Sequence, residues 1–414
     1  MLHRVKYHVG NFLPALRSPN YRLYFFGQGI SLIGTWMQTV AEQWLIYPTL
    51  TTNKSLLGIV SAINLLPVTI LVLFAGVWAD RIDRRKAQMV LQSCYAIIAF
   101  VMSYLIFSGR VEVWHVIVAS AITGIVFAFD MPTRQALMIN LVDKEHFASA
   151  LSLNGAIFNA ARVVGPAIAG ALIAAAGIAP AYLFNGVSFL AVIVSVWMMR
   201  LPIHPKRTEH PPFRGQLAEG FRFVRQTPVV FVSLTLVAIL TIFTWPVNTL
   251  MAVFAHDIYN RGEVGFGLLQ SAFGLGAMVG AFGFHALYEK VRRKNRLLLS
   301  CVFVIFFSTM TYALWHQFIL SLLMLFFSGW SVATMIGILN TVVQESVPDR
   351  LRGRILSYYS FVLVGGMPFG ALLASLGVGI ISAPLTIALC ALLFGLASVV
   401  ILYSTRDTFL TKLI

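Results

Sequence analysis

Long apolar runs, separated by short basic segments, constrain this chain more than any other feature. Examples are residues 57–78, 87–109, 181–199, 297–315 and 384–403. A helix needs about 20 consecutive apolar residues to cross the hydrocarbon core of a bilayer. Hydrophobic residues make up 58% of the chain and charged residues 11%, a composition far more apolar than that of a soluble domain. The sequence therefore predicts an all-α integral membrane protein.

The apolar runs divide into twelve predicted transmembrane helices in two six-helix bundles. The predicted spans are about 21–47, 55–78, 86–108, 112–134, 148–174, 179–200, 228–255, 264–288, 295–315, 317–341, 353–376 and 380–404. The connections are short except for 201–227, which is rich in proline and charge. We expect an N-terminal bundle (1–200), a cytoplasmic linker (201–227) and a C-terminal bundle (228–414).

Basic residues indicate the orientation of these helices, because cytoplasmic loops carry an excess of Lys and Arg. With the N-terminus inside, the outer loops hold only Lys54, Arg110 and Arg261, and Arg162 lies within a span. The other 26 of the 30 basic residues are then on the inner side. We expect both termini in the cytoplasm. The net charge of +15 is then explained by topology and by anionic lipids, with no nucleic acid partner.

Several function classes are excluded by what the sequence lacks. The three cysteines lie within apolar runs and read as packing residues, with no metal or other cofactor expected. The sequence has no zinc-protease motif, Walker loop or nucleophile elbow, so we expect no enzyme activity and no ATP hydrolysis. Energy for any transport would come from an ion gradient or from the gradient of the substrate.

Both signs of charge gather in the stretch "GVWADRIDRRK" at 76–86. Arg84 and Arg85 can be explained as positive-inside anchors, but acids contribute little to topology. Asp80 and Asp83 therefore need a second explanation. The segment 283–294 occupies the same slot in the second half and keeps the basic cluster without the Asp.

A weak internal repeat relates the two halves. The segments 141–172 and 346–377 share a pattern at an offset of 205 residues, in which Gly165 falls on Gly370. Two six-helix halves joined by a polar linker are typical of parallel repeats around a central site.

The residues of the charged stretch resemble a signature of the major facilitator superfamily. Gly76, Asp80, Arg81, Arg84 and Arg85 fit the pattern G-x-x-x-D-[RK]-x-G-[RK]-[RK], and Asp83 stands where Gly is usual. The segments 20–51, 129–142 and 160–170 resemble more narrowly the branch of transmembrane secretion effectors that includes the enterobactin exporter. The resemblance implies a bacterial inner-membrane protein whose twelve helices alternate access to a central site. It also implies that Asp80 and Arg81 lock the two halves together, with Asp130 and Arg134 as partners and Arg350 to Arg354 within reach.

Polar residues inside the spans are candidates for a substrate or proton pathway, because an intramembrane charge costs several kcal/mol unless it is paired or wet. Arg162 lies near mid-membrane and reads equally well as a buried structural pair. Glu42 reads either as a proton carrier or as a carboxylate that reaches the outer interface. The remaining candidates are Gln38, Asn64, Asn159, Trp245, Asn248 and Tyr358.

Gly165, Pro166 and Gly170 predict a kink in the fifth span, where small residues allow close helix contact. The resemblance links this pattern to antiporters, although Ala169 replaces one glycine of the fuller motif.

Taken together, these features predict a monomeric secondary transporter that exports a small organic compound, a siderophore-like metabolite or a drug, by proton antiport. Its partners would be that substrate, protons and membrane lipids. The alternatives left open are a lysolipid or lipid-precursor flippase and a transport-inactive receptor or scaffold.

Overall fold

The structure is a computed structural model that describes residues 14–199, 213–290, 294–406 and 409. These residues are helical throughout apart from short connections. The first set of long helices, called the N-terminal helices, comprises α2 (Pro19–Trp44), α3 (Ser55–Arg81), α4 (Arg84–Phe107), α5 (Val113–Met138), α6 (Phe147–Ala176) and α7 (Ala179–Met198). The second set, the C-terminal helices, comprises α9 (Pro228–Val253), α10 (Gly262–Lys290), α11 (Lys294–Leu314), α12 (Phe318–Ser346), α13 (Asp349–Ile380) and α14 (Ala383–Ser404).

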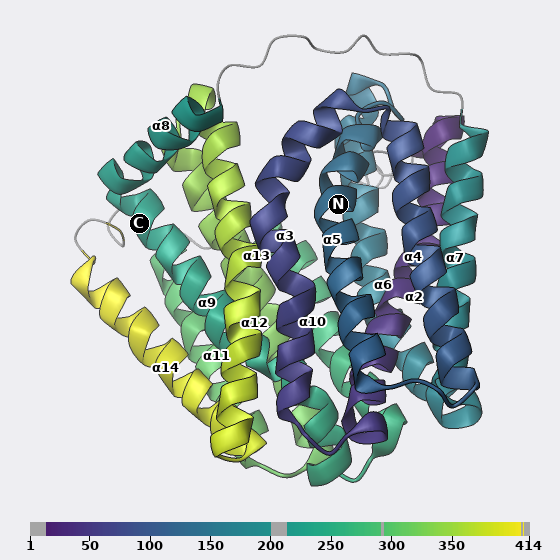
Figure 1. Cartoon of the computed structure of the whole chain (residues 1–414). Coiled ribbons are helices and arrows are strands. Elements are labelled where there is room, and N and C mark those ends of the chain that lie inside the picture. The colour runs from purple at the N-terminus through teal and green to yellow at the C-terminus, as the bar shows by residue number, and fades with distance from the viewer. Residues whose placement is uncertain (1–13, 200–212, 291–293, 407–408, 410–414) are drawn as a thin grey trace, which may run out of the picture.

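Shorter elements extend or connect these helices. They are η1 (Pro14–Arg17), η2 (Leu45–Leu50), η3 (Lys144–His146), α8 (Phe213–Gln226) and η4 (Phe254–Ile258). The wider turns η2 and η4 continue α2 and α9 at equivalent places, so both sets begin with a helix that ends in the same way. We call the end of the molecule that carries η2 and η4 the η2/η4 end, and the opposite end, where α8 lies, the α8 end (Figure 1).

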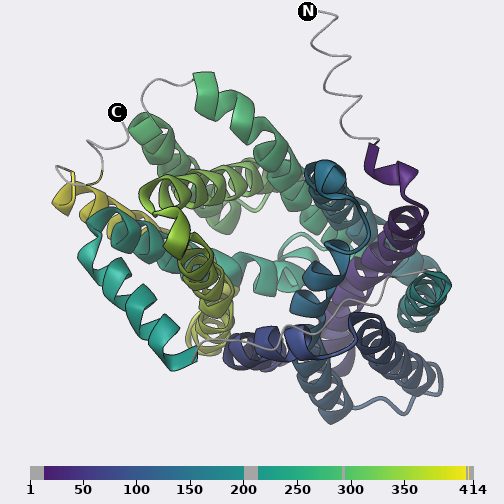
Figure 2. The ribbon, with the colours of Figure 1, turned by 90° about the horizontal axis from the view of Figure 1, so that it is seen from above.

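The same helix pairs pack in both sets. Helix α2 packs against α6 and α7 as α9 packs against α13 and α14, and α3 packs against α5 as α10 packs against α12. The two sets meet along two crossings, α3 with α13 and α6 with α10. Because α3 corresponds to α10 and α6 to α13, the two crossings are equivalent. Figure 2 shows the sets on opposite sides when the molecule is viewed from above.

Apolar cores differ between the two ends of the molecule. At the η2/η4 end one core contains residues of both sets, among them Trp44 and Tyr47 with Phe254 and Phe266. Toward the α8 end the cores are separate. One holds Tyr21, Leu137 and Val196 of the N-terminal helices, and another is built from α8 and the C-terminal helices. The apolar core that the two sets share therefore lies at the η2/η4 end.

Ten of the described helices are long and apolar enough to cross a membrane by length and composition. Helix α3 contributes a shorter apolar stretch, Ser55–Leu71, among the residues that could be assessed. Helix α2 falls below this level because Gln28, Gln38 and Glu42 lower its hydropathy. Multiple membrane spans are therefore supported, and the count of twelve stays a prediction.

Helix α8 lies within the segment that the sequence suggests is only a linker. Its 14 residues include four arginine or glutamate side chains, so a search for apolar runs cannot find it. Gly220 packs against the ring of Tyr358, which places α8 on α13.

Candidate functional site

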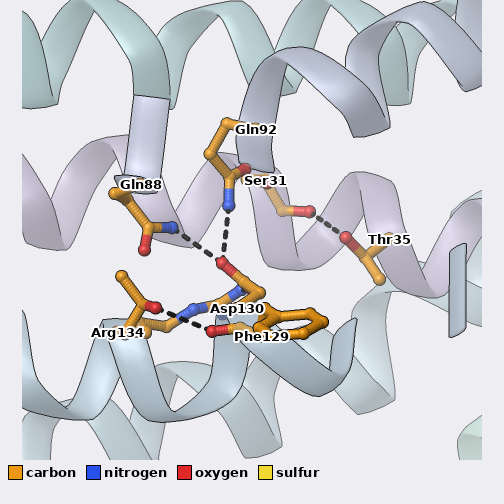
Figure 3. Close-up of polar contacts among 8 residues, drawn as sticks. Ser31, Thr35, Gln88, Gln92, Phe129, Asp130 and Arg134 are labelled. Atoms are coloured by element: carbon orange, nitrogen blue, oxygen red, sulfur yellow. Dashed lines mark hydrogen bonds and ion pairs between the residues drawn. The ribbon is translucent and has the colours of Figure 1, made fainter. Parts of the chain in front are cut away.

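A buried polar cluster lies among the N-terminal helices, toward the α8 end. The Asp130 side chain on α5 is fully buried and accepts hydrogen bonds from Gln88 Nε2 (2.8 Å) and Gln92 Nε2 (3.1 Å) on α4 (Figure 3). Its other oxygen pairs with the Arg134 guanidinium one turn along α5. The pairing follows from the spacing of four residues, which places both side chains on one helix face. The two glutamines share a face of α4 for the same reason.

The charged stretch at 82–86 joins helix ends. Asp83 caps the start of α4 by accepting hydrogen bonds from the backbone N–H groups of Arg85 (3.0 Å) and Lys86 (3.2 Å). The Arg85 guanidinium donates to the carbonyls of Val196 (3.0 Å) and Trp197 at the end of α7. Unpaired carbonyls at a helix C-terminus attract cations, so Arg85 does more than anchor a loop.

Arg84 does the same for a second helix. Its Nη1 donates to the carbonyl of Ala136 (3.2 Å) in the last turn of α5 and contacts Asn140 Oδ1 at 3.4 Å. The start of α4 is therefore fastened to the ends of both α5 and α7. Gly76, Asp80 and Arg81 lie on the last turns of α3, but their side chains are outside the described part, so their gating role stays a prediction.

The second-half arginines expected to meet Asp80 have other partners here. Arg350 and Arg354 on α13 both pair with Glu219 of α8, at 2.9 and 2.5 Å, and Arg352 pairs with Asp349 at 2.7 Å. The sequence interpretation missed this arrangement because it treated the segment around Glu219 as linker.

Glu42 is part of a polar group that connects three N-terminal helices. Its Oε1 accepts a hydrogen bond from the buried Ser120 hydroxyl of α5 (2.7 Å), and the Ser120 carbonyl accepts one from Asn64 Nδ2 of α3 (3.1 Å). One turn earlier on α2, Gln38 Oε1 accepts a hydrogen bond from Asn185 of α7 (2.7 Å). The predicted pathway residues Gln38, Glu42 and Asn64 therefore face neighbouring helices of their own set.

Arg162 on α6 lies between aromatic rings from both sets. Its guanidinium carbon is 5.7 Å from the ring centre of Trp36 on α2 and 5.2 Å from that of Phe273 on α10. These distances are within the range of a cation–π interaction. The alternative reading of Arg162 as half of a buried ion pair has no support among the described residues, where the ion pairs involve other side chains.

Two glycines of α6 allow the close contact between helices that the sequence predicts around Pro166. A Cβ on Gly165 would be 2.6 Å from Trp36 Cβ, and one on Gly170 would be 2.6 Å from the Glu263 carbonyl oxygen of α10. Pro166 lies inside α6 and removes a backbone donor there, and its own carbonyl faces Gly267. Ser271 of α10 donates to the carbonyl of Val163 at 2.7 Å.

The remaining predicted pathway residues do not form one group. Trp245 Nε1 on α9 is 3.4 Å from Ser61 Oγ of α3 and so links the two sets, while Asn248 is half-buried further along α9. Asn159 donates to the carbonyl of Gly155 in its own helix at 2.8 Å. Tyr358 packs against α8, away from the positions of Trp245 and Arg162.

An ion-pair cluster at the η2/η4 end was missed by the sequence interpretation. Asp257 of η4 accepts a hydrogen bond from the Tyr47 hydroxyl of η2 (2.5 Å) and pairs with Lys54 Nζ (2.5 Å). His256 Nδ1 lies 2.7 Å from the same carboxylate, and its ring contacts Trp44 and Tyr47. We call Tyr47, Lys54, His256 and Asp257 the outer latch. One signal was available: Lys54 is one of only three basic residues assigned to the outer side.

Comparison with known proteins identifies the family. The sequence model of the family described as "transmembrane secretion effector" matches residues 10–408. The staphyloferrin A transporter of Staphylococcus aureus is 24% identical over 85% of this chain and 88% of its own, and macrolide efflux protein A of Streptococcus pyogenes is 24% identical over 86% and 90%. The enterobactin exporter of Escherichia coli is 30% identical over 57% of this chain and 56% of its own.

A solved structure shares the fold. A bacterial homologue of the human lysosomal transporter Spinster, in an inward-facing and occupied conformation, superposes with a TM-score of 0.75 at 13% identity, over 95% of this chain and 98% of that one. The resemblance seen in the sequence is thereby confirmed. The chain belongs to the transmembrane secretion effector family of major facilitator transporters, and it is a multi-pass membrane transporter and not an enzyme.

Proposed function

We propose that this protein exports a small organic compound across the bacterial cytoplasmic membrane by alternating access, driven by proton antiport. The observation that carries the proposal is the difference between the two ends. One apolar core and the outer latch join the two sets at the η2/η4 end, while the sets have separate cores toward the α8 end. Two helix sets that share a core at one end and have separate cores at the other are suited to alternating access.

The proposed topology has twelve spans with both termini in the cytoplasm. The α8 end then faces the cytoplasm, and the arrangement described here is inward-facing. Residues 1–200 and 228–414 rock against each other about the α3–α13 and α6–α10 crossings, with 201–227 as the linker. Export follows when substrate enters from the cytoplasm and the outer latch then separates.

We assign the proton to Glu42. Its described contact is with a neutral hydroxyl, Ser120, whereas the buried carboxylate of Asp130 is already paired with Arg134. A carboxylate in the hydrocarbon region without a basic partner is most stable when it is protonated. Glu42 therefore has reason to pick up a proton in one state and release it in another.

The relatives indicate two substrate classes. Two of them are described as transporting siderophores, staphyloferrin A and enterobactin, and one as effluxing macrolides. We propose a siderophore-like metabolite first, because the relatives include transporters of staphyloferrin A and enterobactin, and a drug as the second candidate, because others efflux macrolides or several drugs.

The test uses purified full-length protein in liposomes with a pH-sensitive dye inside. With a proton gradient across the liposome membrane, addition of a siderophore or a macrolide should cause a release of protons that the dye reports. Glu42→Gln should abolish this release while substrate binding persists. Glu145→Gln, which changes an exposed carboxylate, is the control and should behave as wild type. Substrate flux that is unchanged in Glu42→Gln would overturn the assignment of the proton.

Two further outcomes separate the alternatives. Movement of lysolipid between leaflets without proton release would favour a flippase, and binding without any flux would favour a receptor or scaffold. Asp80→Ala should lower transport with expression largely kept, because the family resemblance assigns this side chain to the inner gate. Near-normal transport by Asp80→Ala would remove it from the gate.

A further inference from the structure

Arg162 occupies a position where a charge is costly and where both sets meet. It is the sixteenth of the 30 residues of α6, so it lies halfway along the helix. A Cβ on Gly274 of α10 would be 2.8 Å from the Arg162 carbonyl oxygen, which places this residue at the crossing between the sets. A cation at such a depth costs several kcal/mol unless it has a partner.

The described part of the chain supplies no anion for this cation. Of the two carboxylates that the structure describes within the N-terminal helices, the half-buried Glu42 is hydrogen-bonded to Ser120 and the buried Asp130 is paired with Arg134. No hydrogen bond from the Arg162 side chain to another described residue accompanies its ring contacts. A guanidinium has five N–H donors in a planar fork, so ring contacts leave its hydrogen-bonding capacity unused.

The apolar neighbours of Arg162 are aromatic rings. Trp36 is from α2 and Phe273 from α10, and Phe158, one turn before Arg162 on α6, lies edge-on to Trp36 with ring centres 5.9 Å apart. Phe158 is 45% exposed, so other residues of the protein leave part of its ring uncovered. These rings suit the aromatic or apolar body of an organic molecule.

We propose that Arg162 binds the acidic group of the transported molecule and that the substrate is an organic anion, a carboxylate attached to an aromatic or apolar body. This inference rests on the proposed transport function. A carboxylate accepts two parallel hydrogen bonds from a guanidinium, the strongest pairing available to Arg. Because Trp36 and Phe273 belong to different sets, a ligand held at Arg162 contacts both bodies that have to move.

The binding site is one-sided. At the offset of 205 residues that relates Gly165 to Gly370, Arg162 corresponds to Met367, which has no charge. The C-terminal helices therefore offer no second cation at this position. One acidic group of the substrate is recognised here, and the rest of the molecule is selected by shape.

The test compares three ligands of one shape but different charge. Biphenyl-4-carboxylate, biphenyl-4-carboxamide and 4-(aminomethyl)biphenyl are titrated into full-length protein in detergent, and binding is measured by calorimetry. We expect the carboxylate to bind about tenfold more tightly than the amide, a typical gain for one charge-assisted contact. The amine should bind most weakly because its charge repels Arg162.

Two variants connect this preference to Arg162. Arg162→Gln should weaken carboxylate binding about tenfold and leave amide binding within twofold, and Arg162→Lys should retain part of the preference. The matched control is Arg261→Gln, which removes an exposed arginine with a similar ring contact, 5.6 Å from Phe318, at the η2/η4 end. This control should bind all three ligands as wild type does.

The wild-type ranking decides the question even if Arg162→Gln fails to fold. Equal binding of the three ligands, preference for the amine, or no binding of the carboxylate would each overturn the anionic substrate class. Those results leave the transport function untouched, because proton-coupled flux of a neutral or cationic compound in liposomes would still support it. Absence of flux for every compound, with carboxylate preference intact, would instead overturn the transport function.

Discussion

The N-terminal and C-terminal helices have the same framework but different interiors. In the first set α6 approaches α2 where Gly165 meets Trp36, and in the second set α13 approaches α9 where Gly370 meets Trp245. The contacts are at equivalent places, with a Cβ–Cβ distance of 2.6 Å in one set and 2.7 Å in the other for a Cβ built on each glycine. Close helix approach at a small residue was therefore retained in both sets.

The interiors toward the α8 end differ in polarity. Asp130, with Gln88, Gln92 and Arg134, fills the N-terminal set. At the repeat offset Asp130 corresponds to Met335, which is fully buried in an apolar core. Among the described residues at this end, the arginines of α13 form their ion pairs at the surface, where Glu219 of α8 is 40% exposed. One set therefore has an ion pair among its helices, Asp130 with Arg134, whereas the ion pairs of the other, Glu219 with Arg350 and Arg354, lie at its surface.

Replacement of Asp130 should have the largest effect. Asp130→Asn leaves Arg134 without its counter-charge, and breaking a buried ion pair costs about 3–5 kcal/mol. We expect a marked fall in the thermal unfolding midpoint in detergent and loss of transport. Met335→Leu, at the equivalent apolar position, should cost less than about 1.5 kcal/mol. Equal sensitivity at the two positions would break the contrast between the interiors.

The two glycine contacts should respond alike. Gly165→Ala and Gly370→Ala each place a Cβ against a tryptophan, and such overpacking costs about 1–3 kcal/mol. Both should therefore lower the unfolding midpoint by similar amounts. Gly155→Ala has open space around it and should be neutral or slightly stabilising. A large effect at only one of the two contacts would mean that the equivalent helix contacts contribute unequally to the stability of the two sets.

The outer latch should control conformation more than stability. Lys54 and Asp257 are 36% and 25% exposed, and partly exposed ion pairs contribute about 0–1 kcal/mol. Lys54→Asp or Asp257→Lys should shift the balance between states by up to about fivefold. Accessibility of a cysteine introduced at Ser61, measured by alkylation, reports the shift. The double exchange should restore the wild-type rate, and failure to do so would separate the pair from the gate.

Removal of Glu219 should have the smallest effect. Glu219→Gln releases Arg350 and Arg354, but the first of these pairs is exposed and the second is partly exposed. We expect a change of less than about 1 kcal/mol in the free energy of unfolding, measured by denaturant titration beside Asp130→Asn. A loss comparable to that of Asp130→Asn would mean that α8 is integral to the C-terminal set.

Much of the helical architecture could be predicted from the sequence, because apolar runs report membrane spans directly. The span predicted at 228–255 compares with α9 at Pro228–Val253, and that predicted at 317–341 with α12 at Phe318–Ser346. Helix α8 could not be found in this way, because it is polar and follows a proline-rich stretch. Local pairs were also predictable, as with Asp130 and Arg134 at a spacing of four.

The rest of the site depends on contacts between distant segments. Tyr47 and Asp257 are 210 residues apart, and Glu42 and Ser120 are 78 apart. A sequence shows that such side chains lie in spans but not which helix each one faces. Arg162 illustrates the limit, because its depth was predictable while its aromatic neighbours from α2 and α10 were not.

The backbones of α6 and α10 are in direct contact where the two helices cross. Gly267 and Gly274 of α10 lie directly on the backbone of α6 at Pro166 and Arg162, and the Arg162–Phe273 ring contact lies beside them. At these two glycines no side chain of α10 stands between the helix backbones, so the crossing angle can change there with little steric resistance. In the proposed alternating-access cycle, we expect the slow step to be the separation of Trp44 from Phe266, whose ring centres are 5.9 Å apart. The turnover rate should therefore depend on the size of the side chains at 44 and 266 far more than on substitutions at the edge of the contact between α6 and α10.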